Sequence, residues 1–264
     1  MKNKKLIISM LLIGLVSLFI GIRSFFFVVK EQVNQNKPEK QKNNLALPEA
    51  ISDQEENKKA SKIIISETNQ IKNMFAESAF LTVVSLKNAP LTQEKKIDLL
   101  NKINSLYKYG SLSGGKITHE FSNIEKYRNF QKKYGYNTIK EKVSFSPKDL
   151  LLSNSTLKLT GSYYSGGYTK NKGFDSLYRL YEAPNGEKIE INQTKLSKDG
   201  MKLLIIEETL NYRLPNEIPA TFETFDYEKT YSLRFFHNGY RYAISTQNLD
   251  KNYIINLANY LTEN

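Results

Sequence analysis

The chain has 264 residues, a formal charge of +11 at pH 7, no cysteine and two histidines. Without cysteine there is no disulfide framework and no lipid anchor on an N-terminal cysteine, and two histidines are too few for a histidine-based metal cluster. Residues 1–30 carry five basic residues and no acidic residue, so the remainder has a charge of +6. This mildly basic surface suits an anionic membrane or wall polymer. We find no basic cluster with interleaved aromatics and no helix-turn-helix pattern, so we expect no nucleic acid partner.

Residues 6–29 form an apolar stretch whose single charge is Arg23. A helix of 24 residues covers roughly 36 Å, which is enough for a hydrocarbon core of about 30 Å. Three lysines precede the stretch, which is typical of a segment whose N-terminus stays in the cytoplasm. The sequence therefore predicts a single-pass protein of the cell membrane, with residues 1–30 as cytoplasmic tip and anchor and the C-terminal domain outside.

Two alternatives to this topology stay open. The stretch could be a signal peptide that is cleaved after Ser24, although Phe25 to Val29 continue the apolar run beyond that point. Lysines also follow the stretch, so an inverted orientation keeps some support. Residues 31–60 are polar and of mixed charge, and we interpret them as a disordered linker.

Residues 61–139 show helical periodicity and predict a helical subdomain of three amphipathic helices. The first continues to Asn88, and the second begins at the N-cap Thr92 and ends at Gly110. The third follows a capping box at Ser122–Glu125 and ends at Gly135. The predicted buried stripe of the second helix is Ile97, Leu100, Ile103 and Tyr107.

Residues 140–264 predict an antiparallel α+β domain. A short helix is expected at Ser146–Asp149, and strands at 156–164, 201–208 and 221–227. Two Asn-Gly dipeptides indicate hairpins with two-residue type I′ turns. Their registers would place Leu180 opposite Ile191, Phe235 opposite Tyr242 and His237 opposite Tyr240. A closing helix begins after Asp250, and its buried stripe is Ile254, Leu257, Ala258 and Leu261. The expected fold class is α+β: a transmembrane helix, a helical segment, then a sheet of hairpins covered by a C-terminal helix.

The segments 180–193, 233–245 and 249–258 resemble a domain of unknown function. That domain ends many membrane-anchored proteins of Gram-positive bacteria, including anti-sigma-factor-type regulators. The resemblance covers roughly residues 145–261, and it implies a lipoprotein-carrier-like fold in which a curved antiparallel sheet packs on a helix. It implies no catalytic residues, and no sigma-binding domain fits before the anchor.

Patterns that could indicate chemistry are weak. Gly110–Lys116 matches the phosphate-loop spacing, but Ile117 stands where a magnesium-binding hydroxyl belongs, so a Gly/Ser turn between helices is the better interpretation. Ser105–Lys108 and Ser113–Lys116 match a serine-enzyme motif, but the K-T-G strand that accompanies it is missing. Glu207 and Glu208, adjacent on a strand, would point to opposite faces.

We therefore expect no catalytic residue, no metal site and no cofactor. The candidate ligand contacts are Tyr163, Tyr164 and Tyr168, which flank Gly166-Gly167 and would be exposed on a glycine loop.

The expected function is a membrane-tethered extracytoplasmic module that senses or binds and is not an enzyme. Its partners would be the membrane, through the single N-terminal helix, and an unknown surface protein, wall polymer or lipid. Two alternatives are a lipid or acyl-chain carrier with a curved sheet, and an accessory subunit of a secretion or conjugation apparatus.

Overall fold

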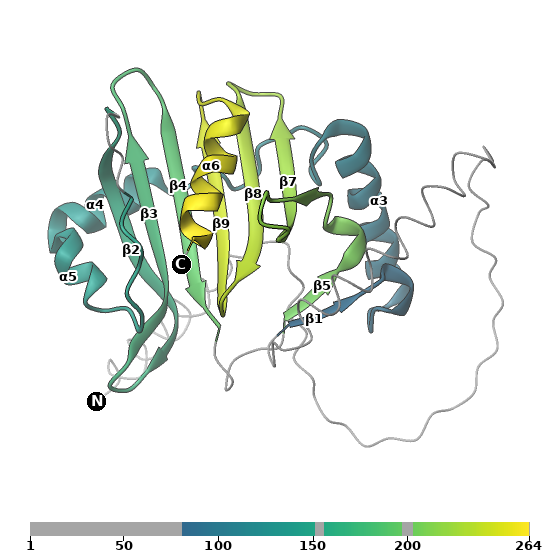
Figure 1. Ribbon diagram of the computed structural model, residues 1–264, viewed down its shortest axis with the longest axis horizontal. Helices are drawn as coiled ribbons and strands as arrows, with labels where there is room; N and C mark the ends of the chain where they lie inside the picture. Colours follow the sequence, from purple (N-terminus) through teal and green to yellow (C-terminus); the bar gives the residue numbers. More distant parts are fainter. Residues whose placement is uncertain (1–80, 151–155, 197–202, 264) are drawn as a thin grey trace, which may run out of the picture.

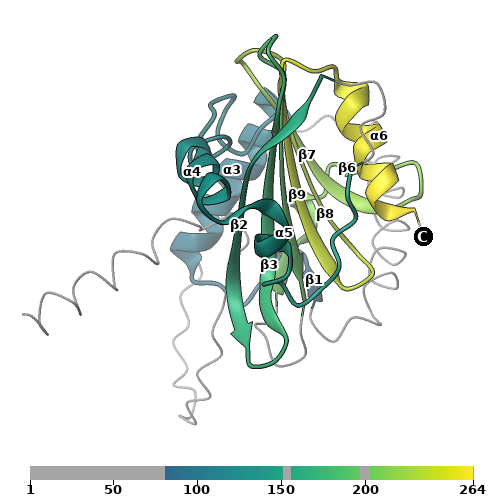
Figure 2. The same cartoon turned by 90° about the vertical axis from the view of Figure 1, so that its left-hand side faces the viewer.

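The computed structural model describes residues 81–150, 156–196 and 203–263. Its centre is a seven-stranded antiparallel sheet with the spatial order β2-β3-β4-β9-β8-β7-β6 (Figure 1). The edge-on view in Figure 2 shows the C-terminal helix α6 on one side of this sheet and helices α3 and α4 on the other. The predicted α+β class, with an antiparallel sheet and a C-terminal helix, is confirmed.

The elements have the following bounds. The strands of the large sheet are β2 (Lys158–Thr169), β3 (Gly173–Glu182), β4 (Lys188–Lys195), β6 (Tyr212–Arg213), β7 (Pro219–Phe225), β8 (Thr230–His237) and β9 (Tyr240–Gln247). A small parallel sheet contains β1 (Leu81–Val84) and β5 (Leu203–Ile206). The helices are η2 (Leu86–Asn88), α3 (Gln93–Tyr109), α4 (Ile124–Tyr134), α5 (Tyr136–Lys140), η3 (Glu207–Thr209) and α6 (Lys251–Thr262).

The predicted membrane segment and linker, residues 1–60, lie outside the described residues, as does the part of the first predicted helix before Leu81. Among the residues that are described, no helix is long and apolar enough to span a bilayer.

The main core lies between the sheet and α6. The predicted stripe of this helix, Ile254, Leu257, Ala258 and Leu261, is buried, as expected. It packs in one cluster with fully buried sheet residues, which include Ile189, Ile191, Leu233, Phe235 and Ile244. Alternation along each strand brings these residues to one face, so this face of the sheet is apolar.

The hairpin at Asn238-Gly239 has the predicted register. Phe235 pairs with Tyr242, and His237 pairs with Tyr240. Asn238 and Gly239 have φ values of 47° and 76°, as a type I′ turn requires.

The hairpin at Asn185-Gly186 differs from the prediction by one residue. Leu180 pairs with Glu190, and Ile191 pairs with Arg179. The Ala183 amide donates to the Glu187 carbonyl, and Gly186 has a φ of +88°. The loop therefore has three residues, the last of which is a glycine in the left-handed region. Compared with the predicted two-residue loop, this places every side chain of the following strand on the opposite face of the sheet.

The first predicted helix is wrong where the structure describes it, because Leu81–Val84 is strand β1. Its sequence Leu-Thr-Val-Val contains three β-branched residues, which favour extended backbone. The partner is the apolar strand β5, and Leu81 pairs with Leu203 in a parallel register.

Helix α3 has the predicted ends but a different buried stripe. The Thr92 side chain caps the helix by accepting from the Lys95 amide, and Gly110 ends it in the left-handed region. The buried residues are Leu99, Ile103 and Leu106, whereas Ile97, Leu100 and Tyr107 are 52%, 39% and 66% exposed. Leu99 and Ile103 meet Leu86, Ala89 and Ile206, so tertiary partners select the face of the helix.

Three smaller predictions are also wrong. The capping box at Ser122 does not form, because Asn123 is the N-cap of α4 and the Ser122 hydroxyl donates to the His119 carbonyl. No helix forms at Ser146–Asp149. Glu207 and Glu208 lie in η3, where the Glu208 carboxylate accepts the Leu86 amide at 2.9 Å and so caps η2.

Helix α4 covers the edge strand β2. An added Cβ on Gly161 would lie 3.1 Å from backbone atoms of Tyr127 and Arg128, so a larger residue would push the helix away from the strand. The Gln131 side chain donates to the Leu159 carbonyl, and Arg128 forms an ion pair with Glu182 of β3. These contacts shield a strand that would otherwise have a free edge.

We expect Gly161→Val to destabilise the domain by about 1–3 kcal/mol, because the side chain has no space beneath the backbone of α4. Thr169→Val, at an exposed position of the same strand, is the matched control and should change stability by less than about 0.5 kcal/mol. Urea unfolding followed by circular dichroism measures both values. Equal stability of the two variants would show that α4 does not need this close approach.

Candidate functional site

The three candidate tyrosines do not lie on a glycine loop, which corrects the prediction. All three belong to β2, and Gly166-Gly167 forms an irregularity within that strand. The ring centroids of Tyr163 and Tyr164 lie 4.6 and 5.4 Å from that of Phe130 of α4. Only Tyr168 is largely exposed, at 65%. Tyr163 and Tyr164 therefore hold α4 on the sheet, and Tyr168 is the member that remains open to a ligand.

A groove of about 750 Å³ opens close to this strand. One wall is the segment from α5 to Pro147, and the other is the turn that joins β2 to β3. Its lining residues are Asn137, Lys140, Glu141, Val143, Ser144, Phe145, Ser146, Pro147, Asn171 and Lys172. We call this feature the α5 groove.

Backbone contacts fix the two walls of the α5 groove relative to each other. The Phe174 amide donates to the Lys142 carbonyl at 2.8 Å, and the Ser144 amide donates to the Phe174 carbonyl at 2.7 Å. A Cβ on Gly173 would lie 2.4 Å from the Lys142 carbonyl oxygen, so glycine is needed for this approach. The Tyr168 ring lies 5.1 Å from the Phe174 ring, which places the exposed tyrosine next to this junction.

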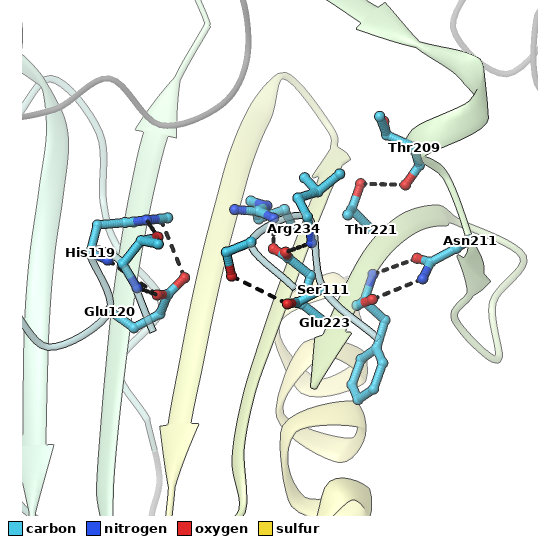
Figure 3. A network of polar contacts seen from close by, with 12 residues as sticks. Ser111, His119, Glu120, Thr209, Asn211, Thr221, Glu223 and Arg234 are labelled. Atoms are coloured by element: carbon cyan, nitrogen blue, oxygen red, sulfur yellow. Dashed lines mark hydrogen bonds and ion pairs between the residues drawn. The ribbon is translucent and has the colours of Figure 1, made fainter. Parts of the chain in front are cut away.

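A second polar region lies on the face of the sheet opposite α6. Arg234 and Glu223 form an ion pair there, and each side chain is only 4% exposed. Arg241 is on the same face, and Glu120 is buried in the loop that covers it. Figure 3 shows Arg234 and Glu223 with Ser111, and His119 and Glu120 to one side. Burial lowers the pKa of both Arg234 and Arg241 to about 10, and the positive charge of Arg234 adds to the effect on Arg241. We call these residues the buried charged layer.

Glu190 joins this layer from β4. Its carboxylate accepts the Tyr178 hydroxyl at 2.8 Å and the Phe121 amide at 3.1 Å. Burial raises the pKa of Glu190 to about 7 despite these hydrogen bonds, and the charge of Glu120 raises it further. Burial and the Glu190 charge together raise the pKa of the Tyr178 hydroxyl well above its ordinary value. Near neutral pH this carboxyl group can therefore hold or release a proton.

The two histidines take different places. His119 Nε2 lies 3.4 Å from a Glu120 carboxylate oxygen, and burial lowers the pKa of His119. His237 lies opposite Tyr240 at the end of a hairpin, as predicted, and burial lowers its pKa too. Among the described residues no group of three or more histidine, cysteine or acidic side chains could hold a metal ion.

The phosphate-loop pattern at Gly110–Lys116 is a turn that follows helix α3. Its amides are directed at the protein itself: the Leu112 amide donates to the Glu223 carboxylate at 2.7 Å, and the Gly115 amide donates to the Ser111 hydroxyl at 2.6 Å. These amide groups are not available to a phosphate. The interpretation as a turn between helices is confirmed, and the turn serves to cover the buried charged layer.

Sequence reasoning missed the partnership of Glu190 with Tyr178 and the α5 groove. The one-residue error in the first hairpin put Glu190 on the wrong face. The register predicted for the second hairpin is correct, and it brings Arg234 and Arg241 to one face of the sheet. The groove has no sequence signal, because its walls are a helix end and a turn that meet only in the folded chain.

Glu190 gives the domain a pH dependence with a definite sign. Its pKa is about 7 in the folded chain and near 4.3 in an unfolded one, so its contribution is complete below about pH 4.3 and is lost as the pH rises through 7. The loss amounts to about 3–4 kcal/mol. We expect Glu190→Gln to remove this decline.

Urea unfolding of the full chain in detergent between pH 4.5 and 8.5 measures the effect, with Glu94→Gln on exposed α3 as the control. His119 acts in the opposite direction, because its lowered pKa favours stability at higher pH. The comparison is therefore also made in a His119→Gln background. Parallel pH profiles for Glu190→Gln and its parent would contradict the assignment.

Known proteins give no identity for this chain. No family model, no curated protein and no solved structure matches it. The resemblance of residues 145–261 to the domain of unknown function therefore stays a prediction.

Proposed function

We propose that the protein is a membrane-tethered extracytoplasmic module that binds a cell-surface component through the α5 groove and performs no catalysis on it. The apolar residues 6–29 support the anchor, and the groove supports the binding role. The observation that carries the proposal is an open recess of about 750 Å³ with rigidly joined walls and a lining of amide, hydroxyl and ammonium groups. The volume of this recess is within the range of small-molecule binding sites, about 300–1,000 Å³.

The arrangement of the other polar groups supports a binding role over an enzymatic one. Glu223 is used by Arg234 and the Leu112 amide, and Glu190 by Tyr178 and the Phe121 amide. These groups stabilise the contact between the loop 111–123 and the sheet. None of them lines the α5 groove, so these buried acidic and basic groups are separate from the recess.

The carrier alternative has less support. In a carrier an acyl chain would lie against the apolar face of the sheet, but α6 fills that face with Ile254, Leu257 and Leu261. A lipid would have to displace this helix. We know of no feature in the described part of the chain that favours the accessory-subunit alternative.

A groove-blocking variant tests the proposal. Ser146 is exposed and lines the α5 groove, so Ser146→Trp should fill it, whereas Asn104→Trp on exposed α3 is the matched control. The full chain is reconstituted in nanodiscs of neutral lipid and incubated with separated wall polymer, peptide and lipid fractions of the source cells.

We expect the parent and Asn104→Trp to retain one of these fractions, and Ser146→Trp to retain at least about tenfold less of it. The retained material should be recovered chemically unchanged. Retention that is indifferent to Ser146→Trp would overturn the groove as the site. Conversion of the retained material into a product would overturn the non-catalytic role.

A further inference from the structure

The charges around the α5 groove are distributed unevenly. Lys140 and Lys172 line it, and Lys142 and Lys170 are the exposed neighbours of other lining residues. A fifth lysine, Lys195, directs its ammonium group to the Ser144 carbonyl at 3.3 Å. Among the residues that line the groove, Glu141 is the single acidic one.

Most of these lysines are not neutralised by the part of the chain that the structure describes. Lys140 pairs with Asp149 at 2.6 Å. The remaining ion pairs between described residues lie elsewhere, and none includes Lys142, Lys170 or Lys172. The three lysines belong to the two segments that form the walls, and Lys172 is the one that lines the recess, so their charges give this region a positive potential.

The spacing of the charges indicates the type of anion. Lys142 belongs to one wall and Lys170 and Lys172 to the other, so they do not converge on one point as the ligands of a small anion would. A chain with repeated negative charges can contact several of them at once, and its affinity gains from each contact. The lining amides of Asn137 and Asn171 and the hydroxyl of Ser146 can bond polar groups between those charges.

A polymer fits the recess better than a flat membrane surface does. The lysines are arranged around a groove, and the apolar lining residues Val143 and Phe145 are buried or half-buried. A membrane-docking surface would expose such residues for insertion. The exposed ring of Tyr168 next to the groove can pack against the backbone of a bound chain.

We propose that the ligand of the α5 groove is an anionic surface polymer that bears phosphate or carboxylate groups. It would contact Lys172, which lines the groove, and Lys142 and Lys170, which are exposed in the two segments that form its walls. This inference rests on the proposed function, since it names the ligand class of the same groove. Binding should weaken as salt screens the lysines.

The experiment compares two variants with the same change in net charge. Lys142→Glu/Lys172→Glu reverses one charge on each wall, and Lys95→Glu/Lys108→Glu reverses two exposed charges on α3. Figure 1 shows α3 at the opposite end of the sheet from α5. The lysines of residues 1–80 are the same in both variants. The full chain in neutral nanodiscs is titrated with polyphosphate, polygalacturonate, neutral dextran and phosphatidylglycerol vesicles.

The expected result is binding of at least one soluble polyanion, a loss of roughly tenfold or more in the groove variant, and a change below about threefold in the α3 variant. Equal losses in the two variants would overturn the inference, because net charge alone would explain them. Binding of vesicles only would overturn it in favour of membrane docking.

Two further outcomes separate this inference from the proposed function. The first outcome is dextran binding that is abolished by Ser146→Trp but unchanged in Lys142→Glu/Lys172→Glu. This would show that the groove is a binding site and would overturn the inference that its ligand is anionic. The second outcome is that no polymer binds but a surface fraction is still retained through the groove. This would overturn the inference of a polyanionic ligand and leave the proposed binding function intact.

Discussion

Arg234→Met is expected to destabilise the domain by about 3–5 kcal/mol. Arg234 and Glu223 are each 4% exposed, so the substitution leaves a buried carboxylate without its counter-charge. The carboxylate must then take up a proton or become hydrated, and either process opposes folding. Because protonation relieves the penalty, the loss should be smaller at pH 5 than at pH 8.

A double variant separates the lost ion pair from the lost packing. Arg234→Met with Glu223→Gln removes both charges and keeps an oxygen that can accept the Leu112 amide. We expect it to recover at least about 2 kcal/mol of the loss, since replacing both members of a buried pair costs less than replacing one. Unfolding by urea, followed by circular dichroism, gives all three values. A double variant as unstable as Arg234→Met would show that the pair does not hold the loop to the sheet through its charges.

Ile254→Asp should destabilise the domain by at least about 4 kcal/mol. Ile254 is fully buried in the cluster between α6 and the sheet, so the substitution removes an apolar side chain and places a carboxylate in the main core. The loss is a large part of the total stability of a small domain. The variant should therefore lose its cooperative thermal transition.

Asn256→Asp is the matched control for this prediction. It introduces the same side chain two residues further along α6, at an exposed position. Its thermal midpoint should stay within about 3 °C of the parent. A cooperative transition in Ile254→Asp at the parent midpoint would contradict the role of α6 as the cover of the apolar face.

Short-range patterns predicted the elements that depend on local geometry. Asn238-Gly239 needs positive φ at two consecutive residues, and this fixes the turn and the register of the hairpin. The stripe of α6 follows from a strong 3.6-residue period. The ends of α3 follow from the Thr92 cap and Gly110. In each case the determining residues lie within a few positions of one another.

Predictions failed where a partner distant in sequence decides the outcome. Leu81–Val84 is a strand because β5 pairs with it, and β5 lies more than a hundred residues away. Leu99 rather than Leu100 is buried because Leu86 and Ile206 approach that side of α3. The first hairpin has a three-residue loop between Ala183 and Glu187 where two residues were expected, and this places Glu190 on the face where it meets Tyr178. The α5 groove arises from the same kind of long-range contact, between Lys142 and Phe174.

The two faces of the sheet have different roles in the domain. The face under α6 is apolar and supplies the stability, whereas the opposite face buries charges that fix the loop 111–123 and α4. With both faces covered, the end of the sheet near β2 and α5 carries the open groove. A ligand can therefore bind there without disturbing either layer.

The domain can bind a cell-surface component only if it is tethered outside the cell. The direct test is protease shaving of intact source cells that carry the full chain with a C-terminal tag, with the mass of the tagged membrane-bound protein recorded first. We expect a full-length tagged protein that loses its tag on intact cells. A tag that stays protected until the cells are lysed would place residues 31–264 in the cytoplasm and contradict the proposed function.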